Sequence, residues 1–387
     1  MKNIFIKLQP KRLASASIAG MFIFSMIGCS EHSDKQASTN TIQTETKDSI
    51  VKENKKKDLK PSGEVPEWGK SITPEMLVVI EKLESFGGKP IETLDAKEAR
   101  KQPTFKDAVV AVMKDYDMAM PPALCDTINK QIPVTGGTTA IRIYTPKQGV
   151  APYPVIIYYH GGGFVIADLD VYGASAQSLC EQSGAIVVSV EYPKGPENKF
   201  PAAHTVSFDA YKWIIKNAAS FNGDPSKIAL VGESAGGNIA INISIMARDK
   251  KIQIPLFQVL VYPVANNDLN DESYVKYAAA KPLNKPAMEW FVKNYLKSSA
   301  QSNDARISVV NANLTGLPPT LIIAAEIDPL QSEGELLNTK LKDAKVDTQY
   351  KLYKGVTHEF FGMASVIPEA KDAQELAVQK IKSAFVK

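Results

Sequence analysis

A serine between two glycines near the middle of the chain has the surroundings of a nucleophile. Apolar residues 228–231 lead into Gly232, Ser234 follows two residues later, and a helix-compatible run begins at Asn238. A strand, a sharp turn and a helix in this order are the setting of a G-x-S-x-G nucleophile elbow. Side chains at Gly232 or Gly236 would collide with the flanking strand and helix, which explains both glycines. An ordinary glycine-rich turn is the alternative.

Serine is a poor nucleophile unless a base takes its proton, and histidine is the usual base. His358 follows the last predicted strand, at the carboxyl edge where sites of open α/β folds form. His204 lies in a helical pattern, where a structural or surface role is expected. His32 lies in a polar N-terminal stretch and is expected to be inert. His358 is therefore the predicted base.

The remaining histidine opens a run of glycines directly after an apolar strand. His160 is followed by Gly161, Gly162 and Gly163. Consecutive glycines are entropically costly, but they allow bare backbone N–H groups to approach a ligand. Such a loop, together with the N–H of the residue after the nucleophile, Ala235, predicts an oxyanion hole. His160 is expected to brace this loop, and a flexible glycine turn is the alternative.

The acid that orients the histidine should lie between the serine and the histidine in the chain. Asp328 follows the apolar run 321–325. A carboxylate there can hold the His358 ring in one tautomer and stabilise its charged form. A turn or helix cap is the alternative role, and Glu326 is the second candidate for the acid. The chain order of Ser234, Asp328 and His358 is that of α/β-hydrolases.

Eight segments predict the strands that position these residues. They span residues 127–134, 139–144, 155–159, 185–190, 228–231, 256–264, 321–325 and 348–353, and the first two flank the hairpin signal Thr135-Gly136-Gly137. Helical patterns at 174–182, 202–219, 238–248, 332–344 and 369–385 separate or follow the later strands. An antiparallel start followed by β–α alternation predicts an α/β fold with a mostly parallel, doubly wound sheet.

Two further segments fall outside this alternation. Residues 68–116 have a helical pattern, and residues 266–311 form a long, polar, partly helical insertion between two strands. We expect a domain over residues 67–387 in which segments of about 67–120 and 266–311 form a helical cap.

These motifs together resemble the bacterial hormone-sensitive-lipase-like carboxylesterases, a branch of the α/β-hydrolase fold. The resemblance extends from about Met76 to the C-terminus, and it includes Asp328-Pro329-Leu330 and Glu333-Gly334. It implies that Gly162, Gly163 and Ala235 donate to the oxyanion. It also implies that the segments from Gly87-Gly88-Lys89-Pro90 to Arg100 and from Trp290-Phe291 to Tyr295 belong to the cap. One segment departs from the family, because Tyr192-Pro193-Lys194-Gly195-Pro196-Glu197 stands where Tyr-Arg-Leu-Ala-Pro-Glu is usual. The substrate range is therefore open.

The predicted function is hydrolysis of short- to medium-chain acyl or aryl esters through an acyl-enzyme on Ser234. No metal and no organic cofactor are expected, and the partner is a small ester. An amidase or peptidase of the same fold is one alternative, and a non-catalytic ligand receptor on the same scaffold is another.

Residues 1–28 predict an export signal, because a basic start is followed by uncharged residues 13–28, which are few for a membrane span. The signal ends before Cys29 in a sequence that resembles a bacterial lipoprotein box, which implies a lipid-anchored protein on the periplasmic or outer-membrane face. A secreted protein without lipid, or an uncleaved anchor, is the alternative. Polar residues 29–66 predict a disordered tether.

Charge and cysteine content add two expectations. The formal net charge is +3, and residues 1–28 contain four basic residues and no acid, so the rest of the chain is near −1. This balance gives no electrostatic footprint for nucleic acid. Cys125 and Cys180 are expected to be unpaired and slightly buried, and a disulfide between them is the alternative.

Overall fold

The central sheet orders the folded part of the chain, and the computed structural model describes residues 58–120 and 122–386. The strands in this part are β1 (Cys125–Val134), β2 (Gly137–Pro146), β3 (Tyr153–Tyr159), β4 (Ile186–Val190), β5 (Gly223–Glu233), β6 (Phe257–Val261), β7 (Thr320–Ile327) and β8 (Thr348–Thr357). Their order is β1-β2-β4-β3-β5-β6-β7-β8. The β1–β2 and β2–β4 pairs are antiparallel and the others are parallel. The predicted α/β fold with an eight-stranded, mostly parallel sheet is confirmed.

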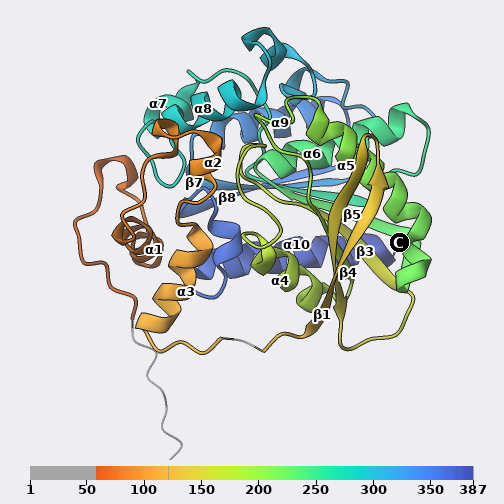
Figure 1. The fold of residues 1–387 in the computed structure, drawn as a ribbon, viewed down its shortest axis with the longest axis horizontal. Coiled ribbons are helices and arrows are strands. Elements are labelled where there is room, and N and C mark those ends of the chain that lie inside the picture. Colours follow the sequence, from red (N-terminus) through yellow and green to blue (C-terminus); the bar gives the residue numbers. More distant parts are fainter. Residues whose placement is uncertain (1–57, 121, 387) are drawn as a thin grey trace, which may run out of the picture. The chain divides into compact units, whose positions relative to one another are not determined.

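The central strands β3 to β7 are apolar on both faces because helices cover both faces. Along β3, Ile156 and Tyr158 pack into one layer, while Val155, Ile157 and Tyr159 pack into the other. The first layer includes α4 (Gly173–Ser183) and α10 (Pro368–Val386), and the second includes α5 (Ala202–Asn217), α6 (Ala235–Asp249) and α9 (Gln331–Asp343). Figure 1 shows α5, α6 and α9 above the sheet and α4 and α10 below it.

The predicted hairpin joins β1 to β2. Val134 pairs with Gly137, so Thr135 and Gly136 form the turn between the strands. Gly136 has a φ of +87°, a conformation that side chains disfavour, which is the reason for glycine at this position.

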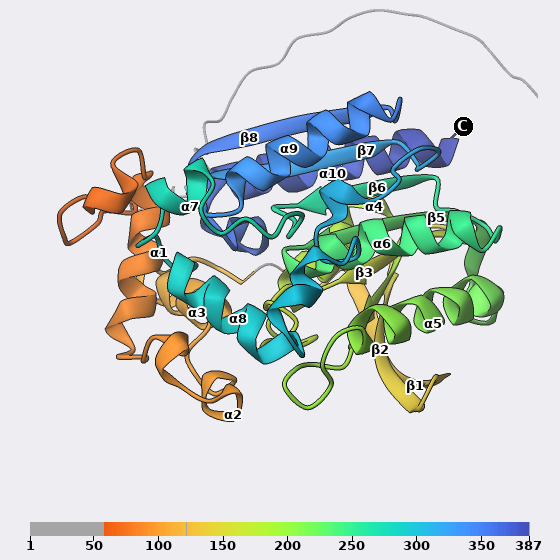
Figure 2. The same ribbon diagram turned by 90° about the horizontal axis from the view of Figure 1, so that it is seen from above.

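The two segments expected to form a cap lie together. The N-terminal one contains α1 (Pro74–Ser85), α2 (Ala96–Ala99) and α3 (Phe105–Asp115), and the insertion contains α7 (Glu272–Lys276) and α8 (Lys285–Tyr295). Short 3-10 helices lie at η1 (Glu67–Gly69), η2 (Ile91–Thr93), η3 (Ala218–Phe221), η4 (Ser299–Asn303), η5 (Val309–Asn311) and η6 (Phe360–Met363). Trp290 Nε1 donates to Leu94 O at 2.9 Å, which joins α8 to the N-terminal segment. Figure 2 shows α8 beside these helices.

The expected signal peptide at residues 1–28, Cys29 and most of the expected tether lie outside the described residues. The last residues of the expected tether, 29–66, make contacts with the folded domain, so the tether ends before residue 66. The amides of Ser62 and Gly63 donate to the Glu81 carboxylate of α1, and Leu59 packs against the same layer of the core. Within residues 58–120 and 122–386, no helix has both the length and the hydropathy that crossing a bilayer requires.

Candidate active site

Ser234 is the single residue between β5 and α6, and its backbone is strained. It has a φ of 55° and a ψ of −118°, which is rare for a side-chain-bearing residue. A Cβ on Gly232 would lie 2.0 Å from Gly236 O, and one on Gly236 would lie 2.0 Å from Tyr159 O. The turn is therefore too tight for any side chain at these two positions, as the sequence predicted.

Asp328 and His358 follow two neighbouring parallel strands, β7 and β8. His358 Nδ1 lies 2.7 Å from Asp328 Oδ2, and both side chains are buried. Leu330 N donates to the other carboxylate oxygen of Asp328 at 2.9 Å, which fixes the carboxylate. An ionised carboxylate accepts only, so Nδ1 carries the proton and Nε2 of the neutral ring is free to act as a base.

The electrostatics of this pair favour a charged imidazole. Burial alone lowers the pKa of His358, but the carboxylates of Asp328 and Glu359 outweigh burial and raise this pKa above its ordinary value. Such a ring takes a proton readily from a hydroxyl, which general-base chemistry requires.

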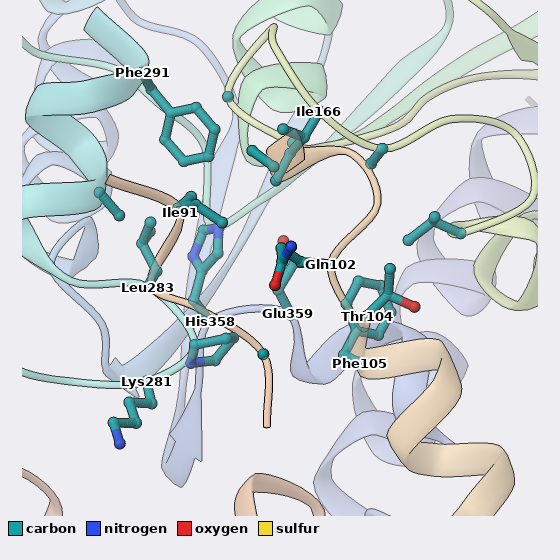
Figure 3. Close-up of a pocket in the computed structure, with 18 of the residues that line it drawn as sticks. Ile91, Gln102, Thr104, Phe105, Ile166, Lys281, Leu283, Phe291, His358 and Glu359 are labelled. Atoms are coloured by element: carbon teal, nitrogen blue, oxygen red, sulfur yellow. The ribbon is translucent and has the colours of Figure 1, made fainter. Parts of the chain in front are cut away.

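Ser234 and His358 line the same pocket, which has a volume of about 410 Å³. Figure 3 shows the His358 ring inside it, between Leu283 and Glu359. Within the described residues, the His358 side chain bonds to Asp328 but makes no hydrogen bond to Ser234. Hydrogen bonds between a nucleophile and its base are often long before substrate binds and shorten in the complex.

The glycine loop after β3 forms another wall of this pocket. Gly162 and Gly163 have φ values of +99° and +56°, and both line the pocket. A Cβ on Gly162 would lie 2.3 Å from Ile166 O, and one on Gly163 would lie 2.2 Å from the Phe291 ring. Because Val165 N and Ile166 N donate to Gly162 O, the loop is a closed turn rather than a flexible run. The neighbouring amide of Ala235 opens helix α6.

His160 lies beneath this loop. Its ring is fully buried, stacks on Tyr192 with a centroid distance of 4.3 Å, and has Nδ1 2.8 Å from Gly161 O. The Tyr192 hydroxyl donates to His160 O and Gly161 O. These contacts fit the bracing role expected of His160.

His204, Glu326 and the two cysteines lie apart from the Asp328–His358 pair in their bonding. The buried His204 ring lies 2.9 Å from Asn238 Oδ1, burial lowers its pKa to about 4, and this fits a structural role. Glu326 accepts from Gly355 N at 2.8 Å. Cys125 and Cys180 are both free and buried. Within the described residues, no group of three or more His, Cys, Asp or Glu side chains is arranged to hold a metal ion.

The sequence analysis assigned no individual role to three residues of the site, namely Glu359, Tyr172 and Arg100. Glu359 has a φ of +74°, lines the pocket beside His358, and accepts at both carboxylate oxygens from the Tyr172 hydroxyl at 2.6 Å. Arg100 donates to Val165 O and Gly195 O and pairs with Glu197. No local pattern marks these residues, because their partners lie far away in the chain.

The comparisons with known proteins agree with this geometry. A sequence model of the α/β-hydrolase fold matches residues 156–362, which include the glycine loop and all three triad candidates. The chain belongs to the α/β-hydrolase fold family. Similarity to proteins with esterase names confirms the resemblance to the carboxylesterases.

Members of this family with esterase names cover most of the chain. The ethyl acetate hydrolase of Pseudomonas putida is 29% identical over 81% of this chain and 99% of the relative. The carboxylesterase NlhH of Mycobacterium tuberculosis is 35% identical over 63% of this chain and 78% of the relative. An esterase structure from Pyrobaculum calidifontis is 35% identical, with a TM-score of 0.72, over 79% of this chain and 98% of that one.

Proposed function

We propose that Ser234, His358 and Asp328 form the catalytic triad of a carboxylic ester hydrolase. Ser234 Oγ attacks the ester carbonyl while His358 Nε2 takes the hydroxyl proton, and the carbonyl π electrons form an oxyanion. His358 then gives this proton to the alcohol oxygen as the bond from the carbonyl carbon to that oxygen breaks. Water, deprotonated by His358, attacks the acyl-enzyme and releases the acid and Ser234.

The oxyanion needs donors that are already in place. We assign this role to the amides of Gly162, Gly163 and Ala235. The positive φ values of the two glycines support it, because the turn keeps this backbone free of side chains. Removing one such donor costs about 10²–10³-fold in turnover.

The observation that carries the proposal is the 2.7 Å contact between His358 Nδ1 and Asp328 Oδ2 at the edge of the pocket that Ser234 lines. Replacement of Ser234 by alanine should abolish turnover of p-nitrophenyl butyrate. A fluorophosphonate probe should label the wild-type chain but not Ser234→Ala. Activity of Ser234→Ala within tenfold of wild type, or labelling elsewhere only, would contradict the triad.

The substrates are short- to medium-chain acyl or aryl esters. A pocket of about 410 Å³ supports this, because apolar side chains cover much of its wall, among them Ile91, Leu283, Met288 and Phe291. A series of p-nitrophenyl esters with two to sixteen acyl carbons tests it. Turnover should fall sharply before the longest chains.

The chain is also proposed to be exported and lipidated at Cys29. The basic and then apolar residues 1–28 and the lipoprotein-type sequence before Cys29 support this. Cells fed an alkyne-tagged palmitate should yield labelled protein in the membrane fraction. The Cys29→Ser variant should carry no label, and equal labelling of both would refute lipidation at this residue.

A further inference from the structure

Polar and apolar side chains both line the pocket. Figure 3 shows Leu283 and Phe291 on one side of the view, and Gln102 and Thr104 on the other, with Phe105 beside Thr104. Glu359 lies next to Gln102 in this view. An ester bound at Ser234 therefore meets both hydrocarbon and polar side chains, the latter including Gln102, Thr104 and Glu359.

Of these polar side chains, Gln102 and Thr104 already make hydrogen bonds within the protein. Gln102 Oε1 accepts from Lys89 N at 2.8 Å, and its Nε2 donates to Glu98 O at 3.2 Å. The Thr104 hydroxyl donates to Asp107 at 2.8 Å, in the capping box of α3. These hydrogen bonds tie both side chains to the N-terminal segment.

Glu359 has more unused acceptor capacity than either of them. A carboxylate offers about four lone-pair positions, and among the described residues Tyr172 is the one donor to Glu359. The Glu359 side chain lines the cavity and remains partly exposed there. Burial raises its pKa to about 7 despite the opposing effects of His358 and Tyr172. An under-satisfied acceptor in a shielded site discriminates strongly between ligands that do and do not supply a donor.

The position of Glu359 places it near the alcohol half of a bound ester. His358 must hand its proton to the leaving alcohol oxygen, so the alcohol half of the substrate lies on the His358 side of the scissile bond. Glu359 follows His358 directly in the chain and lines the same cavity. The acyl half then extends toward Phe291, whose ring lies against Gly163 of the glycine loop.

We propose that Glu359 determines specificity by accepting a hydrogen bond from a hydroxyl group on the alcohol half of the ester. The substrate class is then esters of polyols, such as monoesters of glycerol, in preference to esters of plain alkanols. This inference rests on the proposed ester hydrolysis at Ser234.

The test compares glycerol 1-monobutyrate with propyl butyrate, which has the same carbon skeleton but lacks both free hydroxyls. The wild-type enzyme should show a kcat/KM at least tenfold higher for the glycerol ester, measured by titration of released acid at pH 8. In Glu359→Leu this preference should fall at least tenfold. In Glu359→Gln, which keeps the side-chain size, it should fall at least threefold.

A matched control comes from Glu181 in α4, a partly buried glutamate that lies outside the pocket. Glu181→Leu should keep the wild-type preference. The ratio of the two rates within one variant does not depend on how much of that variant is folded, so partial misfolding does not obscure the result.

Three outcomes would overturn the inference: a wild-type preference below threefold, no turnover of the glycerol ester, or a preference unchanged in both Glu359 variants. Each is separable from failure of the proposed function. In these cases Ser234-dependent turnover of p-nitrophenyl butyrate would persist, whereas failure of the triad proposal would remove that dependence.

Discussion

Asp328 and His358 meet because Ile327 and Thr357, the residues immediately before them, form the last pair in register between β7 and β8. The pairing is not continuous. Ala325 pairs with Tyr353, and the next pair is Ile327 with Thr357. Between these pairs β7 advances by two residues and β8 by four, and a bulge at Gly355 takes up the two extra residues of β8. Without the bulge, Asp328 would lie beside Val356, and His358 would lie two residues too far along the chain.

The Asp328→Asn variant should lose activity through the wrong imidazole tautomer. An amide can donate to Nδ1, which places the ring proton on Nε2, where it blocks proton transfer from Ser234. We expect kcat for p-nitrophenyl butyrate to fall about 10⁴-fold, with the fold retained by circular dichroism. Glu326→Gln is the comparison, because Glu326 bonds to Gly355 N instead of His358. A larger loss in Glu326→Gln than in Asp328→Asn would reverse the assignment of the acid.

The pH profile should reflect the carboxylates around His358. The base must be neutral to act, so kcat/KM should fall as the pH drops through its pKa, which lies above the ordinary histidine value. Glu359 is one of the carboxylates that raise this pKa. In Glu359→Gln the acidic limb should therefore move to lower pH. A limb that stays in place or moves to higher pH would show that Glu359 does not act on His358 electrostatically.

The Gly163→Ala variant should lose turnover by about 10²–10³-fold, the cost of one oxyanion donor. Its new methyl group would meet the Phe291 ring at 2.2 Å, and the residue would keep an unfavourable φ. Gly184→Ala is the control that separates backbone strain from the effect on the loop. Gly184 also has a positive φ, but no atom lies within 4 Å of the Cβ that the substitution adds. The control should lose stability in thermal unfolding while keeping kcat, and equal losses of kcat in both variants would contradict the role of the loop.

Arg100 should couple the N-terminal segment to the glycine loop. Its guanidinium donates to Val165 O at 2.8 Å and Gly195 O at 2.6 Å, and it pairs with Glu197. This pairing lowers the pKa of Glu197 to about 2. Replacement by alanine leaves two carbonyls without donors and should lower kcat/KM about tenfold or more, together with the melting temperature.

The neighbouring Lys101 supplies the control for Arg100. Lys101 pairs with Glu98 at 2.7 Å on the exposed side of the segment, and such surface pairs contribute little. Lys101→Ala should leave both kcat/KM and the melting temperature close to wild type. Comparable effects of the two substitutions would mean that Arg100 acts through general surface charge.

The sequence by itself determined the sheet, its helical layers and the chemical motifs. Unbroken apolar runs and the steric need for glycine are local properties, so they predicted the strands, the hairpin and the tight turn at Ser234. The order of serine, aspartate and histidine likewise follows from the chain alone.

Only the tertiary structure decided which side chains meet. Glu326 and Asp328 both follow the apolar run of β7. Because of the bulge in β8, Gly355 N donates to the Glu326 carboxylate, while the His358 ring bonds to Asp328. The left-handed backbone of Glu359 brings its carboxyl group to the pocket and to Tyr172, 187 residues away in the chain. Such pairings depend on the register and packing of distant segments, which no local pattern of residue types encodes.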